Sequence, residues 1–323
     1  MRSIESDLVH IVRDFLIVHR TFRDVTARYW SGDLRFEHVQ ALVGDSEESV
    51  LFRLKERCHA LFRAGAEGEV VRVRPEALFD LAVGSLFHEA MKFRESLYQR
   101  DVYGPKVRAL RSASEPEVSL LFREFERIFD GVPARLDESL QEAESLLLQT
   151  AGQFRILLEA HAANGLVTRY LIEHGDLVDE VFPDGLDALL EQVHGSPGIA
   201  FVRAAHSYLE SGFFGDARRA LVEAMDRDGS RVQLSRLFAY ADGMQAYLEG
   251  RYGEALDSLS KWVDAAPPRE EQRFADLAFA AVSRVGQLVD KESGETLRVA
   301  AAQLSERIRC FSSPARSGES DRD

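Results

Sequence analysis

Two stretches in the last third of the chain share one pattern, GFFGDARRALVEA at 212–224 and GRYGEALDSLSKW at 250–262. In each stretch an aromatic residue stands two positions after the first glycine, and an alanine stands five positions after it. Gly212 and Gly250 lie 38 residues apart, as do Ala217 and Ala255. A repeat of this length predicts successive helical hairpins, each of which buries its apolar face only against its neighbours.

The repeated pattern resembles the tetratricopeptide repeat, in which small residues let two antiparallel helices approach closely and a glycine closes the turn between them. The first copy matches this family at Gly212, Phe214, Ala217, Leu221 and Ala224, and the second copy matches at Gly250, Tyr252, Ala255, Leu259 and Pro267. The chain departs from the family in its period of 38 residues and in the lack of a terminal proline in the first copy. It also has Asp242 where the family has a large apolar residue. The resemblance covers about residues 198–270, and helices near 274–289 and 296–311 would continue and cap the stack.

The resemblance implies a concave groove lined by the first helix of each hairpin. The exposed positions of those helices would be Ile199, Val202, His206 and Leu209, followed by Leu237, Tyr240, Met244 and Tyr247. Such apolar and aromatic side chains suit an amphipathic helix or an extended apolar segment of a partner protein. The candidate partner-binding residues are Val202, His206, Leu209, Tyr240, Met244 and Tyr247. The alternative is that these residues pack on the chain's own preceding helices, for which Leu186, Leu189 and Leu190 are candidates.

Helical periodicity extends through the rest of the chain. Apolar residues from Leu8 to Tyr29 recur at steps of three and four, which predicts a long helix that ends at Gly32. Pro75 and Pro116 each mark the start of another helix, and a further long helix is expected from Gly131–Pro133 to Asn164–Gly165. Only Val70–Arg74 has the alternation of a strand. The predicted fold class is all-α, with an N-terminal helical bundle followed by an α-solenoid, TPR-like, C-terminal region.

The charge is concentrated in the middle of the chain. The whole chain has a formal net charge of −14, and residues 113–196 alone contain 17 acidic and 5 basic residues. We therefore expect an N-terminal helical domain over 1–112, an acidic helical middle region over 113–196, the repeats with a capping helix over 197–311, and a disordered tail over 312–323. The acidity argues against binding of nucleic acid or an anionic membrane through bulk charge, and it favours a basic protein partner.

No motif in the sequence supplies catalytic chemistry. The two cysteines, Cys58 and Cys310, are too few for a disulfide framework, and Cys58 shares the apolar face of its helix. The pairs Glu56/His59 and Glu191/His194 have a spacing used in di-iron bundles, but in a chain with nine histidines such pairs arise by chance. We expect no metal and no cofactor. The absence of a targeting segment and of a long apolar run leads us to expect a cytoplasmic protein.

A polar and aromatic cluster begins at His88, and its residues have two interpretations. It contains His88, Glu89, Lys92, Arg94, Glu95, Tyr98, Arg100 and Tyr103. Glu89 and Arg100 can be buried partners, whereas Lys92 and Glu95 are equally well placed as surface neighbours on one helix.

The predicted function is that of a non-catalytic adaptor or scaffold in a cytoplasmic assembly, which binds a partner's apolar helix or segment; a homo-oligomer is compatible with this role. The alternative is a DNA-binding regulator with a peptide-sensing repeat domain. A helix at Phe36–Val43, a basic helix with Arg53, Lys55, Arg57 and Arg63, and the strand Val70–Arg74 follow the order of a winged helix-turn-helix. Glu47, Glu48 and Glu56 on the same would-be recognition helix oppose that alternative, because they would face phosphates.

Overall fold

The computed structural model describes residues 4–44, 46–65, 74–228, 231–265, 273–289 and 294–312. Helices are the only regular secondary structure in these ranges, which confirms the all-α class. The predicted strand at 70–74 lies outside the described residues except for Arg74, and Pro267 also lies outside them. None of the described helices combines the length and the apolar character needed to span a bilayer.

The chain divides into two compact units, Met1–Gly195 (unit 1) and Ser196–Asp323 (unit 2), and each is described by itself. The division lies one residue from the expected boundary between 196 and 197. The expected boundary at 112/113 does not separate compact units, because it falls inside a helical hairpin of unit 1.

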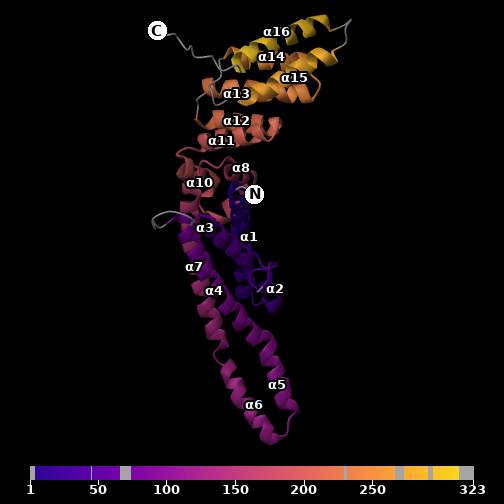
Figure 1. Ribbon diagram of the computed structural model, residues 1–323. Helices are drawn as coiled ribbons and strands as arrows, with labels where there is room; N and C mark the ends of the chain where they lie inside the picture. Colours follow the sequence, from indigo (N-terminus) through magenta and orange to yellow (C-terminus); the bar gives the residue numbers. More distant parts are fainter. Residues whose placement is uncertain are drawn as a thin grey trace, which may run out of the picture. The chain divides into compact units, whose positions relative to one another are not determined.

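Unit 1 is a bundle built on one long antiparallel pair of helices (Figure 1). Its elements are α1 (Ile4–Ser31), α2 (Phe36–Gln40), α3 (Val50–Gly65), α4 (Pro75–Tyr98), a π-helical turn η1 (Gln99–Tyr103), α5 (Gly104–Ala113), α6 (Pro116–Phe129), α7 (Val132–Ala160), α8 (Gly165–Glu173), α9 (Gly175–Val181) and α10 (Gly185–His194). Helices α4 and α7 pack along each other, and α3 packs on both α1 and α4.

The core of unit 1 lies where α1 crosses the α4–α7 pair. The ring of Phe15 in α1 stacks on Phe154 of α7 with centroids 4.2 Å apart, and it meets the edge of Phe79 in α4 at 5.7 Å. All three side chains are buried. Burying each large aromatic side chain contributes on the order of 2–3 kcal/mol, so this cluster is a major source of stability for the unit.

Helix ends agree with the sequence in some places and differ in others. Gly32 ends α1 as expected, with a φ of +78° that favours glycine. Gly165 does not end a helix: α7 stops at Ala160, and Asn164 instead caps α8 by accepting hydrogen bonds from the backbone N–H groups of Leu166 and Val167. A new helix begins at this point because asparagine is among the best N-cap residues.

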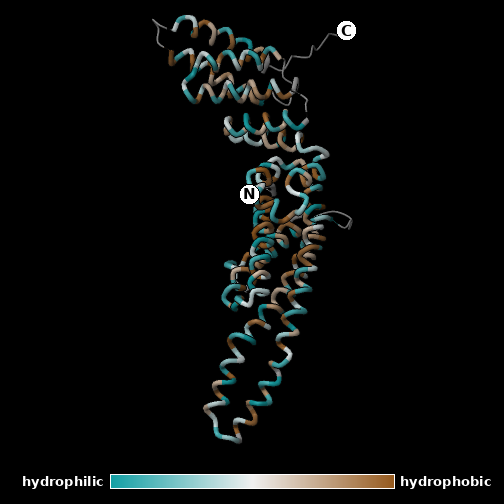
Figure 2. Tube along the Cα trace, turned by 180° about the vertical axis from the view of Figure 1, so that it is seen from behind, coloured by the Kyte–Doolittle hydropathy of each residue, from teal (hydrophilic) through white to brown (hydrophobic). Residues whose placement is uncertain are grey.

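Beyond the bundle, α4 and α7 continue as a two-helix extension formed by α5 and α6 (Figures 1 and 2). No other helix of unit 1 runs beside this hairpin in either view. Figure 2 shows hydrophobic positions interspersed with hydrophilic ones along both of its helices.

Unit 2 consists of successive helical hairpins. Its helices are α11 (Pro197–Glu210), α12 (Phe214–Asp228), α13 (Arg231–Leu248), α14 (Tyr252–Asp264), α15 (Ala275–Leu288) and α16 (Glu295–Ser312), and they pack as the pairs α11–α12, α13–α14 and α15–α16. Gly212 and Gly250 adopt φ values of +78° and +76° in the first two turns, as the repeated pattern predicts. Gly243 lets α13 approach α14 closely, since a Cβ there would lie 2.7 Å from Cγ of Leu259.

Candidate functional site

The aromatic stripe predicted to line a groove in unit 2 lies mostly in the core. Tyr240 is 0% exposed. Its ring stacks on Phe274, with centroids 5.0 Å apart, and packs beside Trp262 at 5.1 Å. Phe274, just before α15, also stacks on His206 of α11 at 6.1 Å. The chain therefore covers this stripe with its own aromatic side chain.

The expected exposure is consequently wrong for part of the predicted set. Leu209, Leu237, Tyr240 and Met244 are buried, and Phe274 packs against Tyr240. The covering group, Phe274, follows the two repeats in sequence. The alternative interpretation of the stripe had instead named Leu186, Leu189 and Leu190, which precede the repeats. Val202, His206 and Tyr247 are half-buried and Ile199 is exposed, so these four side chains retain a surface on which a partner contact stays a prediction.

The phenol of Tyr240 is an unusual group for such a core. Its Oη is buried and has no hydrogen-bond partner among the residues that the structure describes. Burial raises the pKa of Tyr240 well above its ordinary value, so the phenol is neutral at physiological pH. An unsatisfied buried hydroxyl costs about 1–3 kcal/mol.

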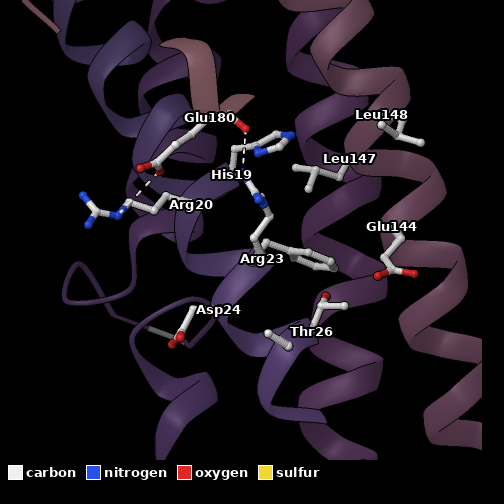
Figure 3. Close-up of a pocket in the computed structure, with 11 residues that line it drawn as sticks. His19, Arg20, Arg23, Asp24, Thr26, Glu144, Leu147, Leu148 and Glu180 are labelled. Carbon is white, nitrogen blue, oxygen red and sulfur yellow. Dashed lines mark hydrogen bonds and ion pairs between the residues drawn. The ribbon is translucent and has the colours of Figure 1, made fainter. Parts of the chain in front are cut away.

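A surface cleft of about 750 Å³ lies in unit 1 between α1 and α7 (Figure 3). Figure 3 shows Leu147 and Glu144 pointing from α7 toward the space beside α1, where His19 and Thr26 lie. The lining residues come from α1, α7 and α9: His19, Arg20, Phe22, Arg23, Asp24, Thr26, Ala27, Glu144, Leu147, Leu148 and Glu180.

The basic side chains of the cleft are engaged by α9. An Nη of Arg23 donates to the backbone carbonyl of Glu180 at 2.8 Å, and Nε of Arg20 lies 3.8 Å from the carboxylate of the same residue. Asp24 in turn accepts from Arg28 at 2.9 Å. These contacts tie α9 to α1, and they leave the α7 side of the cleft as its available wall.

The α1 side of the cleft holds two polar groups with little access to solvent. Nδ1 of His19 and Oγ1 of Thr26 are both buried, and neither has a hydrogen-bond partner within the described part of the chain. Burial, followed by the nearby charge of Arg23, lowers the pKa of His19 below its ordinary value of 6.5. The imidazole is therefore neutral at pH 7, and the cleft gains no positive charge from it.

The α7 wall is apolar and acidic. Leu148 is 70% exposed. Most of its apolar surface therefore stays in contact with water when the chain folds alone. Glu144 stands one turn earlier on the same helix and has no ion pair among the described residues. Sequence reasoning missed this wall. The available signal was the run of three leucines at 146–148, since three consecutive residues of a helix cannot all face one core.

The polar cluster after His88 is arranged as local pairs. Lys92 pairs with Glu89 at 2.6 Å, one turn away on α4, and Arg100 pairs with the adjacent Asp101 at 2.7 Å. Arg100 also donates to the backbone carbonyl of Leu34 at 2.7 Å. Glu89 and Arg100 are thus each engaged with another residue. The cluster borders a second cleft, of about 790 Å³, between α4 and α7, shared with Arg135, Glu138 and Glu142.

The two Glu-x-x-His pairs are separate in the structure. Nδ1 of His59 in α3 lies 3.4 Å from a carboxylate oxygen of Asp80, and Nε2 of His194 in α10 lies 3.3 Å from the hydroxyl of Thr168. Within the described residues no three His, Cys, Asp or Glu side chains cluster closely enough to hold a metal ion. Cys58 is buried as predicted, and burial raises the pKa of its thiol.

The helix proposed to enter a DNA groove, α3, engages three of its four basic residues within the chain, whereas Arg63 is exposed. Arg53 donates to the backbone carbonyl of Glu47, Lys55 sits 4.7 Å from the ring centroid of Phe87, and Arg57 pairs with the buried Asp14 at 3.1 Å. The exposed face of the helix begins with the carboxylate of Glu56. This arrangement disfavours phosphate contact.

The comparisons with known proteins add no relatives to this picture. No protein-family model matches the sequence, and neither a curated protein nor a solved structure resembles it significantly.

Proposed function

We propose that the chain is a non-catalytic adaptor, and that the cleft between α1 and α7 binds a helical or extended segment of a partner protein. The observation that carries this proposal is a wall in a cleft of about 750 Å³, formed by exposed Leu148 and by Glu144, which has no ion pair among the described residues. Clefts of about 300–1,000 Å³ are typical of ligand sites, and this one has room for a few side chains.

The chemistry of the wall defines the partner segment. An apolar side chain against Leu148 would remove apolar surface from water, and a basic side chain one turn away would meet Glu144. The excess of 17 acidic over 5 basic residues across 113–196 would attract a basic segment over a longer range and speed its encounter. The specific contact and the general attraction therefore favour the same class of partner.

Unit 2 supports the same role through its organisation. We propose that its three hairpins form a TPR-like solenoid, on the strength of the repeated pattern and the matching turns at Gly212 and Gly250. Such solenoids bind peptides on their surfaces. Ile199, Val202, His206 and Tyr247 are the candidate contacts that remain accessible there.

The test is affinity capture from the source lysate with the whole chain, in parallel with Leu148→Glu and Glu144→Lys. Leu248→Glu is a matched control, because Leu248 is 62% exposed but lies in unit 2. The proposal predicts a stoichiometric protein that binds the wild type and the control, is lost with both cleft variants, and dissociates more readily at high salt.

Two results would contradict the proposal. One is that the wild type and all three variants capture the same proteins, which would show that the cleft does not bind them. The other is recovery of specific DNA that is released steeply by salt, which would instead favour the regulator alternative.

A further inference from the structure

The hairpin of α5 and α6 exposes more apolar surface than two helices can cover for each other. Gly104 and Val107 are the buried residues of α5, and Val107 is 9% exposed. Phe122 of α6 is half-buried. The large apolar side chains that remain exposed are Leu110, Val118, Leu120, Leu121 and Phe125.

The exposed residues form a stripe and are not scattered. Val118, Leu121 and Phe125 follow one another at steps of three and four on α6, so they share one face of that helix. Leu121 is 64% exposed and Phe125 is 55% exposed. A contiguous apolar face of this kind on a soluble chain marks a contact surface.

The charges of the hairpin make this face complementary to itself. Residues 104–113 contain three basic and no acidic residues, whereas residues 115–130 contain five acidic and two basic ones. Their net charges are equal and opposite, so the hairpin is neutral within a chain of net charge −14. A second copy would therefore meet no net electrostatic repulsion at the hairpin, although the rest of the chain is negatively charged and repels the rest of a second copy.

We propose that the occupant of this face is a second copy of the chain, docked hairpin to hairpin in an antiparallel, two-fold arrangement. The exposed Lys106 and Arg108 stand at the base of the hairpin, and the exposed Glu115 stands at its tip. Antiparallel docking brings the base of one hairpin beside the tip of the other, so Lys106 of each copy meets Glu115 of the partner copy. A two-fold contact repeats the same pairing at both ends.

The packing would complete a four-helix bundle. The stripe of Val118, Leu121 and Phe125 on each copy would become the bundle's interior, as in other antiparallel bundles. With 14 residues, α6 is about 21 Å long, and two helices side by side are about 20 Å wide. The face is therefore smaller than the interfaces of stable complexes, and the dimer is expected to be weak and to dissociate on dilution.

The experiment is sedimentation velocity of the full chain over a concentration series, comparing the wild type with Leu121→Glu/Phe125→Glu. A matched control is Leu81→Glu, because Leu81 is 69% exposed on α4, outside the hairpin. We expect a concentration-dependent dimer for the wild type and the control, and a monomer for the double variant at every concentration. The altered residues are all exposed, and thermal unfolding of each variant would verify that it is folded.

A charge exchange tests the antiparallel arrangement. Lys106→Glu should weaken the dimer several-fold, and adding Glu115→Lys to the same chain should recover most of that loss. A wild type that is monomeric at all concentrations overturns the proposal. This holds also if a different protein is found to bind the hairpin. A dimer that survives Leu121→Glu/Phe125→Glu, or a charge exchange without recovery, overturns it as well. The cleft variants Leu148→Glu and Glu144→Lys leave the dimer unchanged, so this proposal and the adaptor proposal fail separately.

Discussion

The inner and outer halves of one helical hairpin have opposite relations to solvent. In the inner half, α4 and α7 bury an aromatic cluster because α1 crosses them, and Phe15 of α1 stacks on Phe154 at 4.2 Å. In the outer half, α5 and α6 have a comparable apolar stripe with no further helix of unit 1 beside it, and Phe125 is exposed (Figure 1). Apolar residues recur at helical spacing in both halves. An apolar stripe therefore identifies a contact face, and the presence of a covering helix decides whether that contact is made within the chain.

The largest expected effect comes from removing an aromatic side chain in the covered half. Phe154→Ala should destabilise unit 1 by about 3–5 kcal/mol, because it leaves a cavity beside Phe15 and Phe79. Phe125→Ala in the uncovered half should change the stability of the monomer by less than about 0.5 kcal/mol. Hydrogen exchange of α7 peptides, measured at low protein concentration, compares the two variants, and equal losses would break the comparison.

The close approach of α13 to α14 gives a second expected effect in a covered region. Gly243→Val should destabilise unit 2 by about 1–3 kcal/mol, since a Cβ there would lie 2.7 Å from Cγ of Leu259 and 3.1 Å from the backbone oxygen of Ala255. Urea unfolding monitored by the fluorescence of the buried Trp262 measures the change in unit 2. Replacement of Trp30 by phenylalanine in all chains makes Trp262 the single tryptophan. An unchanged midpoint would show that the two helices can separate without cost.

A tyrosine covered by the chain should behave differently from one that retains a surface. Tyr240→Phe should stabilise unit 2 by about 1 kcal/mol, because it removes a buried hydroxyl with no partner among the described residues. Tyr247→Phe is the matched control, since Tyr247 is half-buried, and it should have little effect. The same Trp262 unfolding assay applies, and a destabilised Tyr240→Phe would mean that its hydroxyl has a partner.

The smallest expected effect is a pH dependence from the helix that covers α4 and α7. The pKa of His19 is lowered in the folded chain, so the unfolded chain takes up this proton more readily. Stability is therefore complete above the unfolded pKa of 6.5 and decreases as the pH falls from there through the folded pKa. His19→Gln should reduce the difference in hydrogen exchange of α7 between pH 7.5 and 5.5. The reduction should be partial, because burial lowers the pKa of His10 in the same direction. An undiminished difference would assign the pH dependence to other groups.

Much of the fold could be predicted from the sequence because the helix signals are local. Gly32 and Pro75 mark helix ends in the structure as they do in the sequence, and the turns at Gly212 and Gly250 follow from the repeated pattern. The end of α7 could not be placed in this way, because Asn164 and Gly165 suit either the end of one helix or the start of the next.

The site was harder to predict because exposure depends on distant residues. Tyr240 is covered by Phe274, which no local pattern connects to it. The stripe ending at Phe125 has the same spacing as a buried stripe, and it is exposed because no described helix of unit 1 covers it. Leu148 shows the converse, since its exposure follows from the run of leucines at 146–148 and could have been inferred.

The uncovered half of the hairpin is proposed to be an interface between copies of the chain. The most direct measurement is hydrogen exchange of the wild-type chain at high and low protein concentration. The account predicts that backbone amides in residues 104–129 exchange more slowly at high concentration, whereas those of the covered helices α4 and α7 exchange at the same rate in both. Equal exchange of residues 104–129 at the two concentrations would contradict it.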